Sequence, residues 1–304
     1  MTTVAIVLRI AEEVTAALTD GRPVVALEST LLAHGLPSDR ALTVGRRLEE
    51  LVRAGGAVPA TVAVLDGHAQ VGLSPAQLEQ LCDPDIALAK LSLRDIGPAI
   101  ALGTDGATTV ASTAALAHRA GIPVFATGGL GGVHRDSTWD VSADLQVLGR
   151  TPVLVVSSGV KSILDIPATL EVLETLSVPV LGYRTDGFPA FYRRDSGLPV
   201  SFRVDEASQA AAAFAAHRRF DSGGMLVANP VPVEHEMPAG EHDRILAEAL
   251  DLVARQGTTG KAVTPVLLSH FHYATDGRSV RTNEALVESN VRLGTEIAVA
   301  LCRQ

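Results

Sequence analysis

The sequence PVLVVSSGVKSILDIPATLEVLETLSVPVLG, residues 152–182, contains the clearest indication of the fold. It begins with an apolar, β-branched run at 152–157, which predicts a buried strand. A Leu-rich segment at 167–176 predicts a helix, and a second β-branched run at 178–182 predicts another strand. Because parallel strands need a crossover connection, usually a helix, this order predicts an α/β fold with a parallel sheet.

The same alternation of short apolar runs and longer helical patterns continues on both sides of this stretch. It predicts further strands at residues 23–27, 61–65, 71–73 and 124–126. It predicts further helices at residues 6–18, 42–54, 108–120, 202–220, 242–255 and 283–301, and one that begins at Ser74-Pro75. Asp66-Gly67 predicts a hairpin turn, and therefore an antiparallel pair in an otherwise parallel sheet. We expect one domain over residues 1–304, with three α/β/α layers and a mostly parallel mixed sheet.

Composition and charge exclude several classes of protein. The chain has 304 residues, with 25 Lys and Arg against 34 Asp and Glu, so its formal charge is −9. That acidic balance argues against a nucleic-acid-binding surface, and no apolar stretch is long enough to span a membrane. Two cysteines are too few for a disulfide framework or a zinc cluster. With no recognisable signal peptide, the sequence predicts a soluble cytoplasmic protein with neither a nucleic-acid nor a membrane partner.

Lysine is scarce, which draws attention to each of its positions. The lysines are Lys90, Lys161 and Lys261, and the other 22 basic residues are arginines. Arginine cannot lose its proton in a protein, whereas a lysine amine can be tuned to act as a nucleophile. Lys161 lies just beyond the predicted strand at 152–157, where open α/β sheets place their ligands. It is a candidate for imine formation with a carbonyl group; the alternatives are phosphate binding and a side chain directed to solvent.

Two other segments combine polar side chains with the ends of predicted elements. Glu28 stands where the strand at 23–27 ends, and partial burial there raises a carboxyl pKa toward the range of a general acid or base. A helix cap or an ion pair is the alternative role for this carboxyl. Residues 105–109, DGATT, open a predicted helix, whose free N–H groups and threonine hydroxyls suit an anion. Simple capping by threonine explains the same residues.

A glycine-rich loop follows one of the predicted strands. It reads GGLGG (128–132), and four glycines in five residues allow the backbone to pass close to a ligand. His134 comes soon afterwards, and Asp140, Ser142 and Asp144 follow. The side-chain oxygens of Asp140, Ser142 and Asp144 suit Mg²⁺ or Mn²⁺. From spacing alone, a helix capped by Ser142 is the simpler explanation of these residues.

These segments together resemble the pseudouridine-5′-phosphate glycosidase family, also called the indigoidine synthase A-like family. The motifs that carry the resemblance occur in order along nearly the whole chain. The two most specific read VFATGGLGGVHR (124–135) and KSILDIP (161–167). The others read PVVALEST (23–30), AHGLP (33–37), GAVPATVAVLDG (56–67), GATTV (106–110), SADL (142–145), NPVP (229–232) and GKAVTP (260–265).

The resemblance implies a homotrimeric α/β/α enzyme that uses a divalent metal, typically Mn²⁺. Its implied activity is the reversible cleavage of the C–C glycosidic bond of pseudouridine 5′-phosphate to uracil and ribose 5-phosphate. In that family pattern Lys161 forms an imine with the ring-opened sugar, Glu28 is the acid/base carboxylate, and Asp144 binds the metal together with waters. The positions that match substrate contacts are Lys90, Thr109, Thr127, Gly129, His134, Ser142 and Asn283, with Asn290 as the alternative to Asn283.

The sequence departs from the family pattern in two places. The residues before Lys161 read VSSGV, where an alanine or Cys-Ala run is expected, and the segment 134–140 is diverged. Neither departure removes a functional group named above, but the second bears on contacts to the base or to the metal shell. Two other functions stay open on the residues: another Schiff-base lyase that acts on a sugar phosphate, as an aldolase does, and a non-catalytic sugar-phosphate-binding protein.

Overall fold

The structure is a computed structural model that describes residues 8–135, 139–220, 222–258 and 263–304. Its strands are β1 (Leu8–Ile10), β2 (Val24–Glu28), β3 (Val58–Leu65), β4 (His68–Val71), β5 (Ala89–Leu91), β6 (Gly106–Thr108), β7 (Val124–Ala126), β8 (Leu154–Ser157), β9 (Val180–Tyr183), β10 (Phe202–Val204) and β11 (Met225–Ala228). They form one sheet in the order β1-β4-β3-β2-β7-β8-β11-β9-β10, while β6 pairs with β3 and β5 with β6. The pairs β3–β4 and β3–β6 are antiparallel and the other paired strands are parallel, which confirms the predicted mixed sheet.

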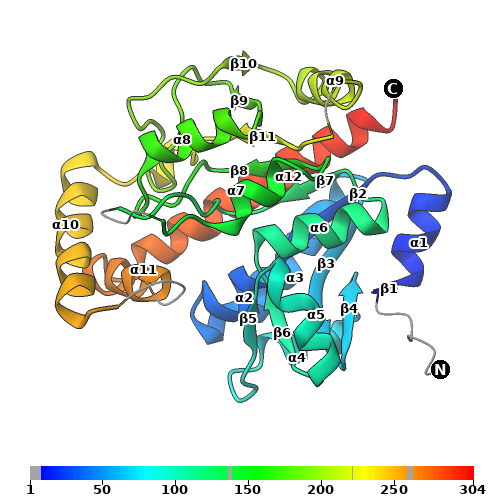
Figure 1. The fold of residues 1–304 in the computed structure, drawn as a ribbon, viewed down its shortest axis with the longest axis horizontal. Helices are drawn as coiled ribbons and strands as arrows, with labels where there is room; N and C mark the ends of the chain where they lie inside the picture. The colour runs from blue at the N-terminus through cyan, green and yellow to red at the C-terminus, as the bar shows by residue number, and fades with distance from the viewer. Residues whose placement is uncertain (1–7, 136–138, 221, 259–262) are drawn as a thin grey trace.

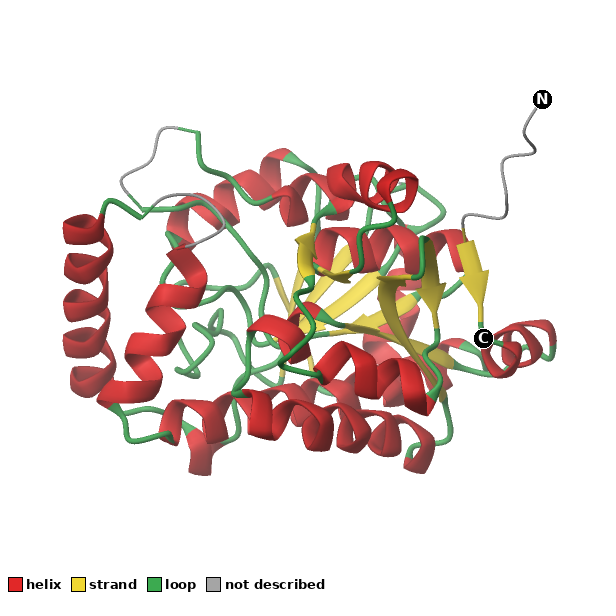
Figure 2. Ribbon diagram, turned by 90° about the horizontal axis from the view of Figure 1, so that it is seen from below, coloured by secondary structure: helices red, strands yellow, loops and turns green. Residues whose placement is uncertain are grey.

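Helices lie on both sides of this sheet, as Figure 2 shows. They are α1 (Glu12–Thr19), α2 (Thr30–His34), α3 (Ser38–Ala54), α4 (Pro75–Cys82), α5 (Leu93–Leu102), α6 (Val110–Ala120), α7 (Ala143–Leu148), α8 (Ile166–Thr175), α9 (Ala207–His217), α10 (Ala239–Gln256), α11 (Val263–Ala274) and α12 (Arg278–Leu301), with a 3₁₀ turn at Val233–His235. Figure 1 shows α10 and α11 together at one end of the molecule. Among the described residues, none of the helices combines the length and the apolar character needed to cross a membrane.

The core lies between the central strands and the helices that cover them. Every residue of β3 and of β8 is buried, as expected for strands that are covered on both faces. The terminal helix α12 packs against β2, β7 and β8. A Cβ at Gly294 would lie 3.0 Å from the Cβ of Ala126, so the helix backbone rests directly on β7. This close approach fixes the position of α12 relative to the C-terminal ends of the strands.

The predicted hairpin connects β3 and β4, but its second strand is His68–Val71 and not the predicted 71–73. Asp66 and Gly67 form its turn with φ values of 52° and 70°, a conformation that asparagine, aspartate and glycine tolerate best. The next helix, α4, begins at the predicted residue with a capping box, in which Ser74 Oγ accepts from the Gln77 N–H at 3.2 Å. The turn and cap residues therefore predicted the position of this turn and the start of α4 correctly.

Three predicted helices were wrong at their first residues, because each prediction includes a short strand. The described part of 6–18 contains β1 before α1, the start of 108–120 belongs to β6, and the start of 202–220 is β10. Each of these strands pairs with a segment distant in sequence: β1 with β4, β6 with β3 and β5, and β10 with β9. Such pairing depends on tertiary context, which local periodicity does not contain.

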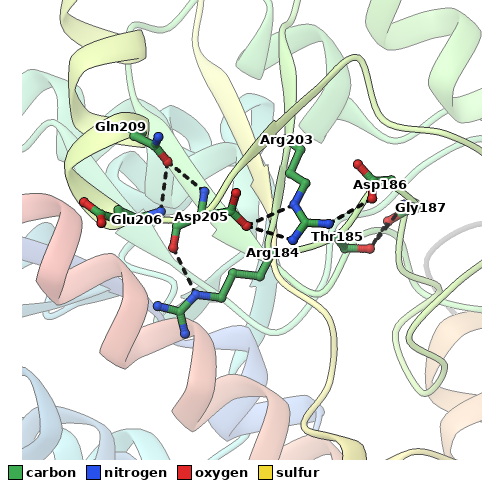
Figure 3. Close-up of polar contacts among 8 residues, drawn as sticks. All are labelled: Arg184, Thr185, Asp186, Gly187, Arg203, Asp205, Glu206 and Gln209. Carbon is green, nitrogen blue, oxygen red and sulfur yellow. Dashed lines mark hydrogen bonds and ion pairs between the residues drawn. The ribbon is translucent and has the colours of Figure 1, made fainter.

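Figure 3 shows the polar contacts of the residues between β10 and α9. Arg203 donates from Nε to Asp205 Oδ1 at 3.0 Å and from Nη1 to Asp186 Oδ2 at 2.9 Å. The side-chain oxygen of Gln209 accepts from the backbone N–H groups of Asp205 and Glu206, at 2.8 and 3.0 Å. Gln209 and Glu206 form a capping box, and α9 begins directly after Glu206.

Candidate active site

The C-terminal ends of three neighbouring strands meet at one edge of the sheet. β2 ends at Glu28, β7 leads into the glycine loop at 128–132, and Lys161 follows the end of β8 by four residues. Since β2, β7 and β8 are adjacent and parallel, the segments that follow them lie side by side. The tertiary structure therefore brings together the carboxyl, the loop and the lysine that the sequence singled out.

Two adjoining cavities open at this edge. We call the smaller one the inner cavity and the larger one, whose volume is about 900 Å³, the outer cavity. The residues that line both are Glu28, Thr30, Lys90 and Lys161. The inner cavity is otherwise lined by Leu31, His34, Gly35, Gly128, Gly129, Phe191, Leu268 and Asn283. Polar and glycine residues that line only the outer cavity include Ser92, Arg94, Thr109, Gly131, His134, Ser142, Asp144 and Arg150.

The surroundings of Glu28 favour its protonated form. Burial raises the pKa of this carboxyl above its ordinary value, and the negative charge of Asp144 acts in the same direction. Lys161, the hydroxyl of Thr127 and Lys90 oppose this rise, because each stabilises the carboxylate. Thr127 Oγ1 donates a hydrogen bond to Glu28 Oε1. A carboxyl with a raised pKa in a cavity shared with a lysine is suited to taking up and releasing a proton.

The backbone at Lys161 is held against the glycine loop. Its N–H donates to the carbonyl of Leu130 at 3.2 Å, and the Leu130 N–H donates to the carbonyl of Gly159 at 3.0 Å. Gly159 has a φ of 75°, and a Cβ there would collide with the carbonyl oxygen of Pro189, so only glycine suits this position. The turn brings the chain from β8 to the cavities, where the side chain of Lys161 lines both.

Asp144 is buried and both of its carboxylate oxygens accept backbone hydrogen bonds. Oδ1 accepts from the Ala111 N–H and Oδ2 from the Gly131 N–H, each at 2.9 Å. The carboxylate thereby links the first turn of α6 to the glycine loop. Ala111 lies at a helix N-terminus, where a negative charge is favourable, so part of the role of Asp144 is structural.

The residues present fit a divalent metal only in a limited way. Among the described residues, no three His, Cys, Asp or Glu side chains are grouped so as to hold a metal ion. Asp144 borders the outer cavity, and each of its oxygens has a second lone pair beyond the one given to a backbone N–H. The site therefore fits a cation that keeps most of its waters and takes one carboxylate, as Mg²⁺ and related ions do.

Positively charged side chains line the outer cavity, although the net charge of the chain is −9. Lys90, Arg94 and Arg150 line it, together with the Thr109 residue that precedes α6. The threonine hydroxyl makes no capping bond to the helix; it lies 3.3 Å from Ser112 Oγ. The prediction that DGATT opens a helix was wrong, because 106–108 form β6, but the helix N-terminus directly after it does border the cavity.

His134 and Ser142 both border the outer cavity, and both also stabilise the loop. The His134 N–H donates to the carbonyl of Asp140 at 2.9 Å, and its Nδ1 lies 4.0 Å from Asp140 Oδ2. Ser142 is the N-cap of α7, where its Oγ accepts from the Asp144 N–H at 3.2 Å. Residues 136–138, within the diverged segment, and Lys261 lie outside the described residues.

The structure separates the two candidate asparagines of α12. Asn283 lines the inner cavity, and its buried Oδ1 has no hydrogen-bond partner in the part of the chain that the structure describes. Asn290 is fully buried: its Nδ2 donates to the Thr127 carbonyl at 2.8 Å, and its Oδ1 accepts from Asn229 Nδ2 at 2.9 Å. Asn283 is therefore the one that faces the inner cavity, while Asn290 joins the helix to the end of β7.

Of the remaining predicted substrate contacts, Gly129 lines a cavity and Thr127 does not. Gly129 lines the inner cavity, and a Cβ there would lie 2.7 Å from Phe191 Cδ2, so a side chain does not fit. Thr127 borders neither cavity and acts through Glu28. Sequence reasoning missed His34 and Phe191 as cavity residues. His34 belongs to the AHGLP motif, which was the available signal, whereas nothing local marks Phe191.

The chain is thus an α/β protein that brings a lysine and a buried carboxyl together at the C-terminal edge of a parallel sheet. The comparisons with known proteins specify it further. The chain belongs to the family described as indigoidine synthase A like protein, whose model matches residues 13–300.

The named relatives align with nearly the full length of this chain. A protein named pseudouridine-5′-phosphate glycosidase from Symbiobacterium thermophilum is 54% identical over 95% of this chain and 96% of its own. One of the same name from Salinispora tropica is 54% identical over 96% of this chain and 91% of its own. The crystal structure of the prealnumycin C-glycosynthase AlnA in complex with ribulose 5-phosphate matches with a TM-score of 0.90 and 40% identity, over 98% of this chain and 97% of that one.

Proposed function

We propose that this protein reversibly cleaves the C–C glycosidic bond of pseudouridine 5′-phosphate, giving uracil and ribose 5-phosphate. Relatives that are more than half identical over nearly the whole chain carry the name of this activity. The observation that carries the proposal is that Lys161 and Glu28 line both cavities, so a nucleophile and an acid/base group border the space where the two products would meet.

A carbon–carbon glycoside lacks a leaving oxygen or nitrogen that can be protonated, so the two-carboxylate logic of ordinary glycosidases does not suffice. An amine solves this problem. In the synthetic direction, neutral Lys161 condenses with the aldehyde of open-chain ribose 5-phosphate, releasing water and forming an imine at C1′. C5 of uracil adds to C1′ of the protonated imine, the electron pair of the C=N bond moves to the nitrogen, and the proton of C5 passes to the Glu28 carboxylate. The C4′ hydroxyl then displaces the lysine amine and closes the sugar ring.

The cleavage direction reverses each step. The neutral lysine opens the ring at C1′, Glu28 delivers a proton to C5 of uracil as the C–C bond breaks, and the imine that remains on Lys161 is hydrolysed. No oxidant or reductant is required, because the electrons of the broken bond leave with the base. The mixed environment of Glu28, in which burial raises its pKa and Lys161 lowers it, suits a group that must both give and take a proton.

The outer cavity is proposed to bind the phosphate. Lys90, Arg94 and Arg150 supply charge there, and the amide groups at the start of α6 supply a favourable dipole. We also propose that Asp144 holds Mn²⁺, or another divalent cation, with waters completing its shell; when bound, such a cation would offset the negative charge of the substrate. The homotrimer stays a prediction of the family resemblance. The cytoplasmic location and the one-domain organisation stay predictions from the sequence.

One pair of measurements tests the function. The purified protein is incubated with Mn²⁺, uracil and ribose 5-phosphate, and we expect pseudouridine 5′-phosphate to form. Borohydride is added to a second sample without uracil, and we expect the mass of the reduced sugar on the peptide that holds Lys161, with no adduct in Lys161→Met. An adduct without coupling to uracil would indicate an aldolase-like lyase instead. The absence of both product and adduct would indicate a binding protein.

A further inference from the structure

The inner cavity combines apolar walls with two polar atoms that lack partners. Its walls include Leu31, Phe191 and Leu268. Five buried side-chain nitrogen or oxygen atoms among the described residues have no hydrogen-bond partner, and two of them, His34 Nε2 and Asn283 Oδ1, belong to residues that line this cavity. Buried polar groups are nearly always hydrogen-bonded, so two orphaned atoms in one cavity point to a ligand that satisfies both.

The surroundings of His34 determine what its free nitrogen can do. Burial lowers the pKa of this imidazole, and the positive charge of Lys90 lowers it further, so the ring is neutral. A hydrogen bond between the ring and the backbone of Ala89 favours a proton on the nitrogen that makes it. Because Nε2 is the nitrogen that lacks a partner among the described residues, we assign the ring proton to Nδ1. Nε2 is then a hydrogen-bond acceptor.

Asn283 Oδ1 is also an acceptor, so the two orphaned atoms both require N–H or O–H donors. A planar pyrimidinedione attached through carbon retains two ring N–H groups, whereas one attached through nitrogen retains a single one. Its flat faces suit the apolar walls. The phosphate, by contrast, carries no donor when ionised and belongs with the cationic side chains of the outer cavity.

We propose that His34 is a specificity-determining residue for the base: its Nε2 accepts a hydrogen bond from one ring N–H of the pyrimidine held in the inner cavity. This inference rests on the proposed function. It divides the site in two, with the base between His34 and Asn283, and the sugar phosphate beyond the shared residues Lys161 and Lys90.

The test compares three bases in the condensation reaction: uracil, 1-methyluracil and 3-methyluracil. The variants are His34→Phe, which fills similar space without an acceptor, and His34→Gln, which restores one. His217→Phe is the matched control, because His217 also has a buried Nε2 without a partner but lines neither cavity. We expect His34→Phe to lower kcat/KM for uracil about ten- to a hundredfold and to leave it nearly unchanged for one of the two methylated bases, since that base cannot make the bond.

Two further readouts separate this role from a structural one. His34→Gln should recover part of the discrimination between uracil and that methylated base, and every variant should still trap ribose 5-phosphate on Lys161 with borohydride. Equal losses for all three bases, or loss of trapping in His34→Phe, would overturn the proposal. Calorimetric binding of uracil alone distinguishes this inference from the proposed function. If uracil binding depends on His34 but no coupling occurs, the proposed function is rejected and the base contact is retained. If uracil binding does not depend on His34, the base contact is rejected.

Discussion

Thr127 donates a hydrogen bond from Oγ1 to Glu28 Oε1, across the neighbouring strands β7 and β2. The carbonyl of the same threonine accepts from Asn290 Nδ2 at 2.8 Å, so the terminal helix also holds this residue. Glu28 is thereby oriented by a partner that borders neither cavity. The bond lowers the pKa of the carboxyl, against the larger effect of burial, which raises it.

Thr127→Val should shift the pH dependence of the coupling reaction. Loss of the hydroxyl removes a contribution that lowers the pKa of Glu28, so this pKa rises further. Because the coupling direction needs the carboxylate, the acidic limb of kcat/KM should move to higher pH, and the rate at neutral pH should fall by about tenfold. Thr127→Ser keeps the hydroxyl and should keep the limb in place. An unchanged limb in Thr127→Val would show that the bond does not control Glu28.

Glu28→Gln should separate sugar capture from coupling. Loss of an acid/base group costs on the order of 10²–10⁴ in rate. We expect that loss in the formation of pseudouridine 5′-phosphate, measured by chromatography, while borohydride still traps ribose 5-phosphate on Lys161. Near-normal turnover in a correctly folded variant would assign Glu28 a structural role.

The same variant should be at least as stable as the wild type at neutral pH. The folded-state pKa of Glu28 is raised, so this group favours the folded state fully below its unfolded value of about 4.5, and that contribution is lost as the pH rises through the folded-state pKa. Glutamine carries no charge to bury. The difference in melting temperature between Glu28→Gln and wild type should therefore grow in favour of the variant from pH 4 to pH 8, and a difference that grows the other way would contradict the assigned burial effect.

Asp144→Ala should lose stability as well as any metal dependence. The substitution leaves the N–H groups of Ala111 and Gly131 without their acceptor, and each buried unpaired group costs about 1–3 kcal/mol. Asp144→Asn retains one carbonyl acceptor and should unfold at an intermediate denaturant concentration. Mn²⁺ binding, followed by electron paramagnetic resonance, should weaken in both. Full retention of Mn²⁺ in Asp144→Ala would place the metal elsewhere.

The two asparagines of α12 should behave in opposite ways. Asn290→Ala breaks buried bonds to Thr127 and Asn229 and should destabilise the fold by about 1–3 kcal/mol in chemical denaturation. Asn283→Ala removes an oxygen that has no hydrogen-bond partner among the described residues, so the stability of the protein should change little, while kcat/KM for uracil should fall. A stability loss in Asn283→Ala as large as that in Asn290→Ala would contradict this division.

The central part of the fold was predictable from the amino-acid sequence. The runs that form β2, β3, β7, β8 and β9 and the patterns of α3, α6, α8, α10 and α12 were identifiable, because burial on both faces of a parallel sheet produces continuous apolar strands. The sequence also singled out Glu28 and Lys161, since each stands just at or beyond the end of such a strand. The family motifs extended the prediction to the other site residues.

The edge strands and the partners of the polar site residues depend on contacts between distant segments. The short strands β1, β6 and β10 exist because distant segments pair with them, and the choice between Asn283 and Asn290 depends on which face of α12 meets a cavity. The bond from Asn290 to Thr127 joins residues 163 positions apart, and the bond from Thr127 to Glu28 joins residues 99 apart. Local periodicity indicates which face of a helix or strand is buried, but it does not indicate which other segment packs against that face. The partners of a polar side chain, and with them its charge and its chemistry, are therefore set when the chain folds.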